Sequence, residues 1–174
     1  MATNGRYFVQ LRRRREGKTD YYQRQKLIVS GKDRMVIRKT NRHIIIQLIS
    51  ALMDGDHTLV HVDSKELSKY GYTGYFGNTP AAYLTGVLFA VKAQQLGYKE
   101  AIVDIGLQVA STGSRVFASV KGALDAGFNV PIGEDILPDM DRCNGVHIAE
   151  YDKRYAKLAS QVDNVKNVIV KELK

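Results

Sequence analysis

The stretch that decides the fold runs from Arg34 to Ile49 and reads RMVIRKTNRHIIIQLI. Two short runs of mainly β-branched residues lie on either side of Thr40–Asn41–Arg42. Valine and isoleucine suit a pleated, half-buried strand, and short polar residues between two such runs are typical of a chain reversal. We therefore predict a β-hairpin in this stretch.

The segments that follow predict a mixed sheet. Asp54–Gly55–Asp56 is a turn signal, and HTLVHVD after it alternates apolar and polar residues, as a third antiparallel strand would. Asn78–Thr79–Pro80 predicts the start of a helix that continues to about Leu96. A strand over 99–105 and a helix from about Ser111 to Gly127 come next. The fold class is therefore α/β (α+β): three antiparallel strands, then alternating strands and helices, with the helices covering a mixed sheet.

The ends of the chain are less regular. Gly17, Gly31 and Asn4–Gly5 interrupt any long helix, so residues 1–33 are expected to form an extended arm that orders mainly on its partner. A short strand over 129–132 and a helix from Asn144 or Gly145 to about Ser160 are expected to complete a domain over 34–160. The pattern assigns no structure to the tail, 161–174.

Positive charge is concentrated at the front of the chain. The whole chain carries +8, but residues 1–42 hold 13 Lys or Arg and 3 acids, giving +10, while the other 13 cations meet 15 acids, giving −2. Such a segment repels itself unless a polyanion lies against it, so nucleic acid is the leading partner. An anionic membrane is disfavoured because the segment has no broad apolar helical face. A solubility tail or a localisation signal is the plainer alternative.

The basic segment combines arginines with tyrosines. Arginine donates two parallel hydrogen bonds to a phosphate and keeps its charge, and tyrosine rings stack on unpaired bases, so the combination suits structured RNA. The hairpin tip extends the charge onto a folded surface. The residues predicted to contact RNA phosphates, sugars or bases are Arg12, Arg13, Arg14, Arg15, Lys18, Tyr21, Tyr22, Arg24, Lys26, Arg38, Lys39, Asn41 and Arg42.

Other functional classes find little support. Asp54, Asp56, Asp63 and Asp104 could form a two-metal nuclease site only if they converged, and nothing in the sequence brings Asp104 to the others. The segment 112–115 follows a strand and opens a helix, but it lacks phosphate-binding loop motifs. A protein adaptor with a basic arm remains an alternative.

We expect no enzyme activity, cofactor, metal site or homo-oligomer. With one cysteine and no apolar N-terminal stretch, we also expect a cytoplasmic location.

Several blocks carry a resemblance to a known family. RRRREGKTDYY, the hairpin stretch, NTPAAYLTGVLFA and DIGLQVASTGSRVFASVKGALDAGFNVP together resemble the archaeal form of the large-subunit ribosomal protein eighteen family, over about Arg6 to Tyr155. The eukaryotic counterpart is called ribosomal protein five, whose insertions and basic C-terminal extension this chain lacks.

The resemblance implies a protein of the large ribosomal subunit that binds 5S ribosomal RNA and helps to seat it on the large-subunit RNA in the central protuberance. It implies a mixed α/β domain with a basic arm threaded between RNA elements, and neighbouring ribosomal proteins as partners. It also places the loop from Tyr70 to Asn78 near the RNA, so that Tyr72 and Asn78 join the expected contacts.

Overall fold

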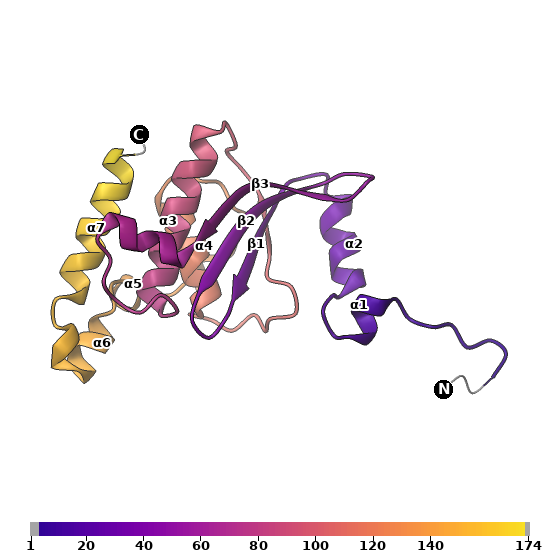
Figure 1. The fold of residues 1–174 in the computed structure, drawn as a ribbon, viewed down its shortest axis with the longest axis horizontal. Helices are drawn as coiled ribbons and strands as arrows, with labels where there is room; N and C mark the ends of the chain where they lie inside the picture. Colours follow the sequence, from indigo (N-terminus) through magenta and orange to yellow (C-terminus); the bar gives the residue numbers. More distant parts are fainter. Residues whose placement is uncertain (1–3, 173–174) are drawn as a thin grey trace.

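The computed structural model describes residues 4–172. Its centre is a four-stranded sheet in the order β3-β2-β1-β4 (Figure 1). The strands are β1 (Arg34–Lys39), β2 (Ile44–Ala51), β3 (Asp56–Asp63) and β4 (Ile102–Asp104). The first three pair antiparallel and β4 pairs parallel to β1, so the predicted hairpin and mixed sheet are confirmed.

One face of the sheet is covered by helices α3 (Thr79–Gln95) and α4 (Arg115–Asp125). Alternation along the strands sends Met35 and Ile37 of β1 into this core, together with Ile46 of β2 and Val62 of β3. The predicted helix after Asn78 is confirmed as α3, and it is buried almost all round because the sheet, α4 and a later helix all pack on it.

Two glycines let α3 and α4 approach closely. A β-carbon on Gly86 would lie 1.9 Å from the carbonyl oxygen of Ser119, and one on Gly122 would lie 2.1 Å from that of Tyr83. Both clashes are with backbone atoms, which cannot move aside independently. The two helices therefore cross at a distance that only glycine allows at these positions, and the helical layer is fixed as one unit.

The chain after residue 128 differs from the prediction. Instead of a strand over 129–132, the structure has a single bridge between Asn129 and Glu100. The single helix expected over 144–160 is wrong: Gly145, at φ 79°, separates α5 (Met140–Asn144) from α6 (Val146–Tyr151), and α7 (Leu158–Glu172) begins afterwards. Residues 161–172, which the sequence left unassigned, therefore continue a helix that crosses the expected boundary at residue 160.

Short 3₁₀ segments connect several elements. They lie at Ser64–Tyr70, Glu134–Ile136 and Lys153–Tyr155. The first follows β3 directly, and it begins with a capping box in which the side chain of Asp63 accepts from Lys65 N. Within residues 4–172, no helix combines the length and the apolar character needed to cross a membrane.

The basic arm, residues 4–33 of the described chain, is not simply extended. It contains the single turn α1 (Arg12–Arg15) and the nine-residue helix α2 (Tyr21–Val29), which Asp20 caps by accepting from the backbone N–H groups of Tyr22 and Gln23. Figure 1 shows α2 beyond β1, set apart from the helical layer, and the N-terminal segment and α7 at opposite ends of the molecule. The expectation of an extended arm is thus wrong for these two helices.

Candidate nucleic-acid interface

The four arginines of α1 are all exposed and spread around one helical turn. Arg12 pairs with Glu16 at 3.4 Å, Arg13 donates from Nε to Thr19 Oγ1 at 2.9 Å, and the Arg14 guanidinium lies 5.0 Å from the centre of the Tyr22 ring. The Arg15 side chain makes no hydrogen bond or ion pair with the described residues. Because these contacts are exposed, they cost little to exchange for phosphates.

The two tyrosines at the start of α2 differ in exposure. Tyr22 is 65% exposed and presents its ring beside Arg14, as a stacking platform would. Tyr21 is half-buried and turns toward the space between α2 and the sheet. Lys26, further along the helix, is exposed and forms no ion pair within residues 4–172. The predicted stacking role therefore suits the outward-facing ring of Tyr22. The ring of Tyr21 instead lines the space between α2 and the sheet.

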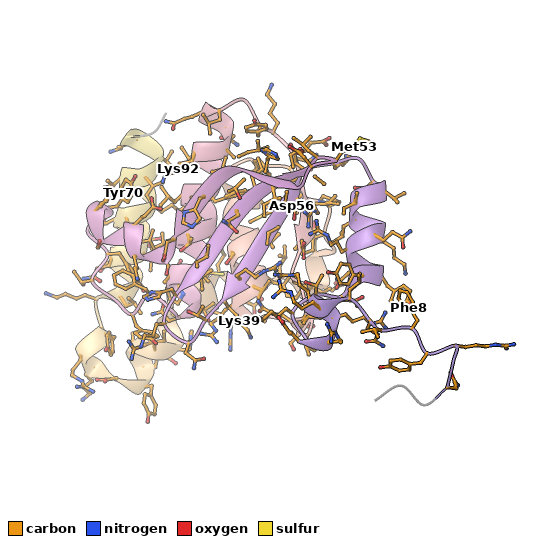
Figure 2. All side chains as sticks on the ribbon, turned by 45° about the vertical axis from the view of Figure 1, so that its right-hand side comes forward. Phe8, Lys39, Met53, Asp56, Tyr70 and Lys92 are labelled. Carbon is orange, nitrogen blue, oxygen red and sulfur yellow. The ribbon has the colours of Figure 1, made fainter. Side chains whose placement is uncertain are left out.

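Arg24 anchors the arm to the folded body. Its two terminal nitrogens donate to the two carboxylate oxygens of Asp56, each at 2.8 Å. Asp56 begins β3, 32 residues further along the chain, and Figure 2 shows it at the end of the sheet that faces α2. Arg24 was predicted to contact a phosphate; since both ends of its fork are occupied by Asp56, we assign it to positioning the arm.

The same carboxylate continues into a buried network. Arg34, only 2% exposed, donates from one terminal nitrogen to Asp56 and from the other to Asp104 of β4, both at 2.9 Å. Arg38 approaches the second oxygen of Asp104 at 3.8 Å, and Gly106 N–H donates to that oxygen at 2.9 Å. Three arginines and two aspartates thus link α2, β1, β3 and β4.

Electrostatics favours the charged state of the anchor. The hydrogen bond from Arg24 holds the pKa of Asp56 below its usual range, with Arg34 adding to the effect against the cost of burial. The hydrogen bond to Asp56 in turn raises the pKa of Arg24. Removing one partner of such a network leaves a buried charge unpaired, which costs about 3–5 kcal/mol in fully buried cases. At neutral pH the network therefore stays charged and holds α2 against the sheet.

The tip of the β1–β2 hairpin is rigid and free to bind. The Thr40 hydroxyl accepts from the backbone N–H groups of Arg42 and His43, and Tyr75 donates its hydroxyl to the Asn41 carbonyl at 2.6 Å. Lys39, Asn41 and Arg42 are exposed, and their side chains make no hydrogen bond or ion pair inside the described chain. Figure 2 shows Lys39 at the end of the sheet near α1.

Two predicted contacts from the glycine- and tyrosine-rich loop point inward. Tyr72 is 2% exposed, and burial raises its pKa to about 12 although the hydrogen bond to Asn78 opposes this. The Asn78 side chain accepts from both Tyr72 Oη and the Ala81 N–H, as the N-cap of α3. Both residues therefore support the loop, and Tyr75, 52% exposed beside the hairpin tip, is the ring that faces outward.

Sequence reasoning missed two sets of residues. Arg34 was counted only as part of the basic charge, and Asp104 was considered as a metal ligand; pairing β1 with β4 brings the two together. The arm also carries exposed apolar side chains before α1, with Phe8 82% and Tyr7 49% exposed. The signal for these was the apolar run from Tyr7 to Leu11 next to the arginines.

The aspartates considered as a nuclease site do partly converge, contrary to expectation. Asp56 and Asp104 lie on either side of Arg34 and are neutralised by it together with Arg24 and Arg38. Among residues 4–172, no three His, Cys, Asp or Glu side chains form a group that could hold a metal ion. At the other candidate position, Ser114 precedes α4 without a side-chain cap, and Arg115 donates to the Gly77 carbonyl at 2.5 Å. Neither arrangement resembles a catalytic centre.

Comparison with known proteins gives a consistent result. The family model described as ribosomal large subunit proteins 60S L5 and 50S L18 matches residues 5–99 and 93–133. A protein of Methanocorpusculum labreanum named large ribosomal subunit protein uL18 is 73% identical over 173 residues, covering 99% of both chains. Its namesake in Methanoregula boonei is 58% identical over 173 residues, also covering 99% of both. One from Thermofilum pendens is 55% identical over 153 residues, or 88% of this chain and 78% of that one.

The match extends from the arm through the sheet and the α3–α4 layer, and the two relatives that match 99% of the chain cover α7 as well. It confirms the resemblance seen in the sequence and the expectation that the protein is not an enzyme. This chain belongs to the family of large-subunit ribosomal proteins L5 and L18.

Proposed function

We propose that this chain, a structural constituent of the large ribosomal subunit in the cytoplasm, binds 5S ribosomal RNA. We further propose that it helps to attach this RNA to the large-subunit RNA in the central protuberance. The family supports the ribosomal role. The proposal for 5S ribosomal RNA rests on the resemblance of the arm and hairpin blocks and on the distribution of charge.

The observation that carries the proposal is the set of unpaired cations in the arm and at the hairpin tip. In the described part of the first 42 residues, five Lys or Arg side chains have no hydrogen bond, ion pair or ring contact: Arg6, Arg15, Lys26, Lys39 and Arg42. Arg12, Arg13, Arg14 and Lys18 have only exposed partners within the arm itself. Since the remainder of the chain carries a net charge of only −2, a polyanion is needed to neutralise this surplus.

The arrangement favours recognition of RNA shape. The arginines of α1 can contact phosphates on more than one side of the helical turn, and the hairpin tip holds a second cationic group at a fixed place on the body. Phosphate contacts position a protein without selecting a sequence, so selectivity would come from the folded RNA fitting both groups at once. Tyr22, Tyr75 and Phe8 offer exposed rings to unpaired bases.

Neighbouring ribosomal proteins are the second class of partner in this proposal. The segment from Glu134 to Asp141 is acidic and exposed at most positions, and it lies away from the arm. It is a candidate for contact with a basic neighbour. We do not expect a homo-oligomer.

The direct test mixes purified protein with total ribosomal RNA and sequences the RNA that remains bound. Enrichment of 5S ribosomal RNA over fragments of the larger RNAs is expected. Equal recovery of all RNAs in proportion to their length would refute selective binding. A protein adaptor is distinguished by pulldown with and without ribonuclease, because the partners of an adaptor would survive the digestion whereas ribosomal partners bridged by RNA would disappear.

A further inference from the structure

A cavity of about 510 Å³ lies between the arm and the sheet. The N-terminal half of α2 and the residues before it form one wall, and the open face of β1, with the loop after β4, forms the other. The volume falls within the roughly 300–1,000 Å³ typical of sites that hold a small organic molecule. Since this face of the sheet lies opposite the helical layer, the cavity is separate from the hydrophobic core.

The charge of the lining favours an anion. Five cationic and three acidic residues line the cavity, giving +2. Arg24 and Arg34 are matched by Asp56 and Asp104 in the ion-pair network, which leaves Arg13, Lys18 and Arg38 against Asp20. Lys18 also pairs at 2.9 Å with the carboxylate of Glu16, which lies outside the lining, and Arg38 shares Asp104 at 3.8 Å. Asp20 already caps α2. The surplus cations come from both walls, because Arg13 and Lys18 belong to the arm and Arg38 to β1.

Arg38 is held at the cavity by a close backbone. Gly106, at φ 62°, lets the loop after β4 pass beside the guanidinium, where a β-carbon would lie 2.7 Å from one terminal nitrogen. That nitrogen donates to the carbonyl of Ile37 at 3.2 Å. The side chain nevertheless remains 46% exposed. Arg38 is thus held in place beside Asp104, at 3.8 Å, while much of its guanidinium stays accessible to a phosphate.

The buried part of the lining contains an unused donor. Arg34 is 2% exposed, and its terminal nitrogens are paired, but its Nε finds no hydrogen-bond partner among the described residues. A buried donor without a partner costs about 1–3 kcal/mol, so a ligand that supplies an acceptor here would be stabilised. This Nε is enclosed in the present conformation, so an acceptor in the cavity reaches it only when the Arg34 guanidinium turns toward the opening.

The rest of the lining suits a flat, partly apolar group. Leu27 of α2, Val36 of β1 and Leu107 after β4 line the cavity together with the half-buried Tyr21. An inorganic phosphate would be too small to touch these side chains. A nucleotide has an anionic phosphate for the cationic rim, a planar base for the apolar wall, and carbonyl or ring nitrogen acceptors for Arg34.

We propose that this cavity receives a single unpaired nucleotide of the bound RNA. Its phosphate lies among Arg13, Lys18 and Arg38, its base packs against Tyr21, Leu27 and Leu107, and one of its acceptors takes the hydrogen of Arg34 Nε. The inference rests on the proposed function, since it assigns one nucleotide of that RNA to a defined place. The Arg24–Asp56 ion pair then has a role in this site, because it holds the two walls of the cavity together.

The first test fills the cavity with a side chain. Gln23→Trp places an indole in the lining from α2, and Gln25→Trp places the same group on the same helix at an exposed position outside the lining. Neither glutamine side chain makes a hydrogen bond within residues 4–172, so both variants should fold. Affinity for 5S ribosomal RNA should fall roughly tenfold or more for Gln23→Trp, as expected when one stacked base is displaced, and stay within about twofold for Gln25→Trp.

The second test works from the RNA and does not depend on any variant folding. Each unpaired nucleotide of 5S ribosomal RNA is replaced in turn by an abasic one, and binding to the wild-type protein is measured. One position should weaken binding about tenfold, and the same replacement should have no effect with Gln23→Trp, because the base is already excluded.

The outcomes separate the two proposals. If wild-type protein fails to select 5S ribosomal RNA, the proposed function fails. If it selects the RNA but both tryptophan variants bind equally well and no abasic position matters, the RNA-binding role stands and the nucleotide site is refuted.

Discussion

Helices α2 and α7 lie at opposite ends of the molecule and are attached to it in opposite ways (Figure 1). α7 buries Leu158, Val162, Val165 and Ile169, spaced three or four residues apart, against α3. None of the nine residues of α2, all of them described, is buried, and its link to the body is the Arg24–Asp56 ion pair. One helix is thus part of the core, and the other is held in place while its surface stays available.

This difference separates two roles within the chain: α7 packs the core, and α2 presents its surface to a partner. A helix of nine residues is marginal in water on its own, because helices below about 12–15 residues are not stable without tertiary contacts. The polar anchor therefore orders α2 without covering its cations. In α7, Lys166 donates to the Tyr83 hydroxyl at 2.6 Å, and Tyr83 donates to Asp125 at 2.7 Å, so even the polar contacts serve packing.

The largest expected effect comes from truncating matched isoleucines of the two helices. Ile169→Ala in α7 empties a fully buried position and should lower the free energy of unfolding by about 2–5 kcal/mol. Ile28→Ala in α2 changes a side chain that is 40% exposed and should cost about 0.5 kcal/mol or less. Urea denaturation measures both. Equal decreases in stability would show that α2 is packed like a core helix.

The next effect concerns the anchor. Asp56→Asn weakens the bonds to Arg24 and the buried Arg34 and should cost about 1–3 kcal/mol, while α2 loses its protection from amide hydrogen exchange. Asp54→Asn in the same turn is the control, because the Asp54 side chain is 77% exposed and, among residues 4–172, pairs only with His57, at 3.5 Å. Unchanged exchange in α2 after Asp56→Asn would mean that the ion pair does not hold the arm.

The anchor also predicts a dependence on pH. The pKa of Asp56 lies below its usual value because of the hydrogen bond from Arg24, so its stabilising contribution is complete above the unfolded pKa of about 3.9 and disappears as pH falls through the lower folded value. Exchange protection of α2, corrected for intrinsic rates, should stay level from about pH 8 to pH 5 and fall below about pH 4. A fall near neutral pH would point to a different titrating group.

The smallest expected effect is the slow reaction of a buried thiol that lies next to α7. Cys143 in α5 is fully buried beside α7, and burial raises the pKa of its thiol to about 11, so native protein at about pH 8 should react with a thiol reagent very slowly. A cysteine placed on α2 by Gln25→Cys should react at once. Rapid labelling of Cys143 in wild-type protein would show that α7 opens readily.

Local pattern was enough to predict the hairpin, the third strand and the helix after Asn78, because each has turn or cap residues next to a regular apolar period. It failed for α2, which has too few apolar residues on one side to show a period, and for α7, because Gly145 and the polar segment around Asp152 hid where the last helix begins. Tertiary packing, and not the local conformational preference of the residues, determines where these two helices form.

The candidate site shows the same limit. Clustered charge identified the arm and the hairpin tip, but a charge count does not distinguish an arginine that is free from one that is paired. Arg24 and Arg34 are committed to Asp56 and Asp104, which lie 32 and 70 residues away from them along the chain, respectively. Only the pairing of β1 with β4 and the docking of α2 bring these partners together. The spacing of residues in the sequence does not predict either contact.

The most direct measurement is the salt dependence of 5S ribosomal RNA binding, with four cations removed from either end of the molecule. Arg12–Arg15 changed to alanine should lower affinity and reduce the slope of log K against log salt by up to about 3–4, at roughly 0.7–0.9 for each phosphate that the variant no longer neutralises. The matched control changes the exposed Lys153, Arg154, Lys157 and Lys171 in and near α7 and should leave the slope unchanged. Equal slopes for the two variants would contradict the account.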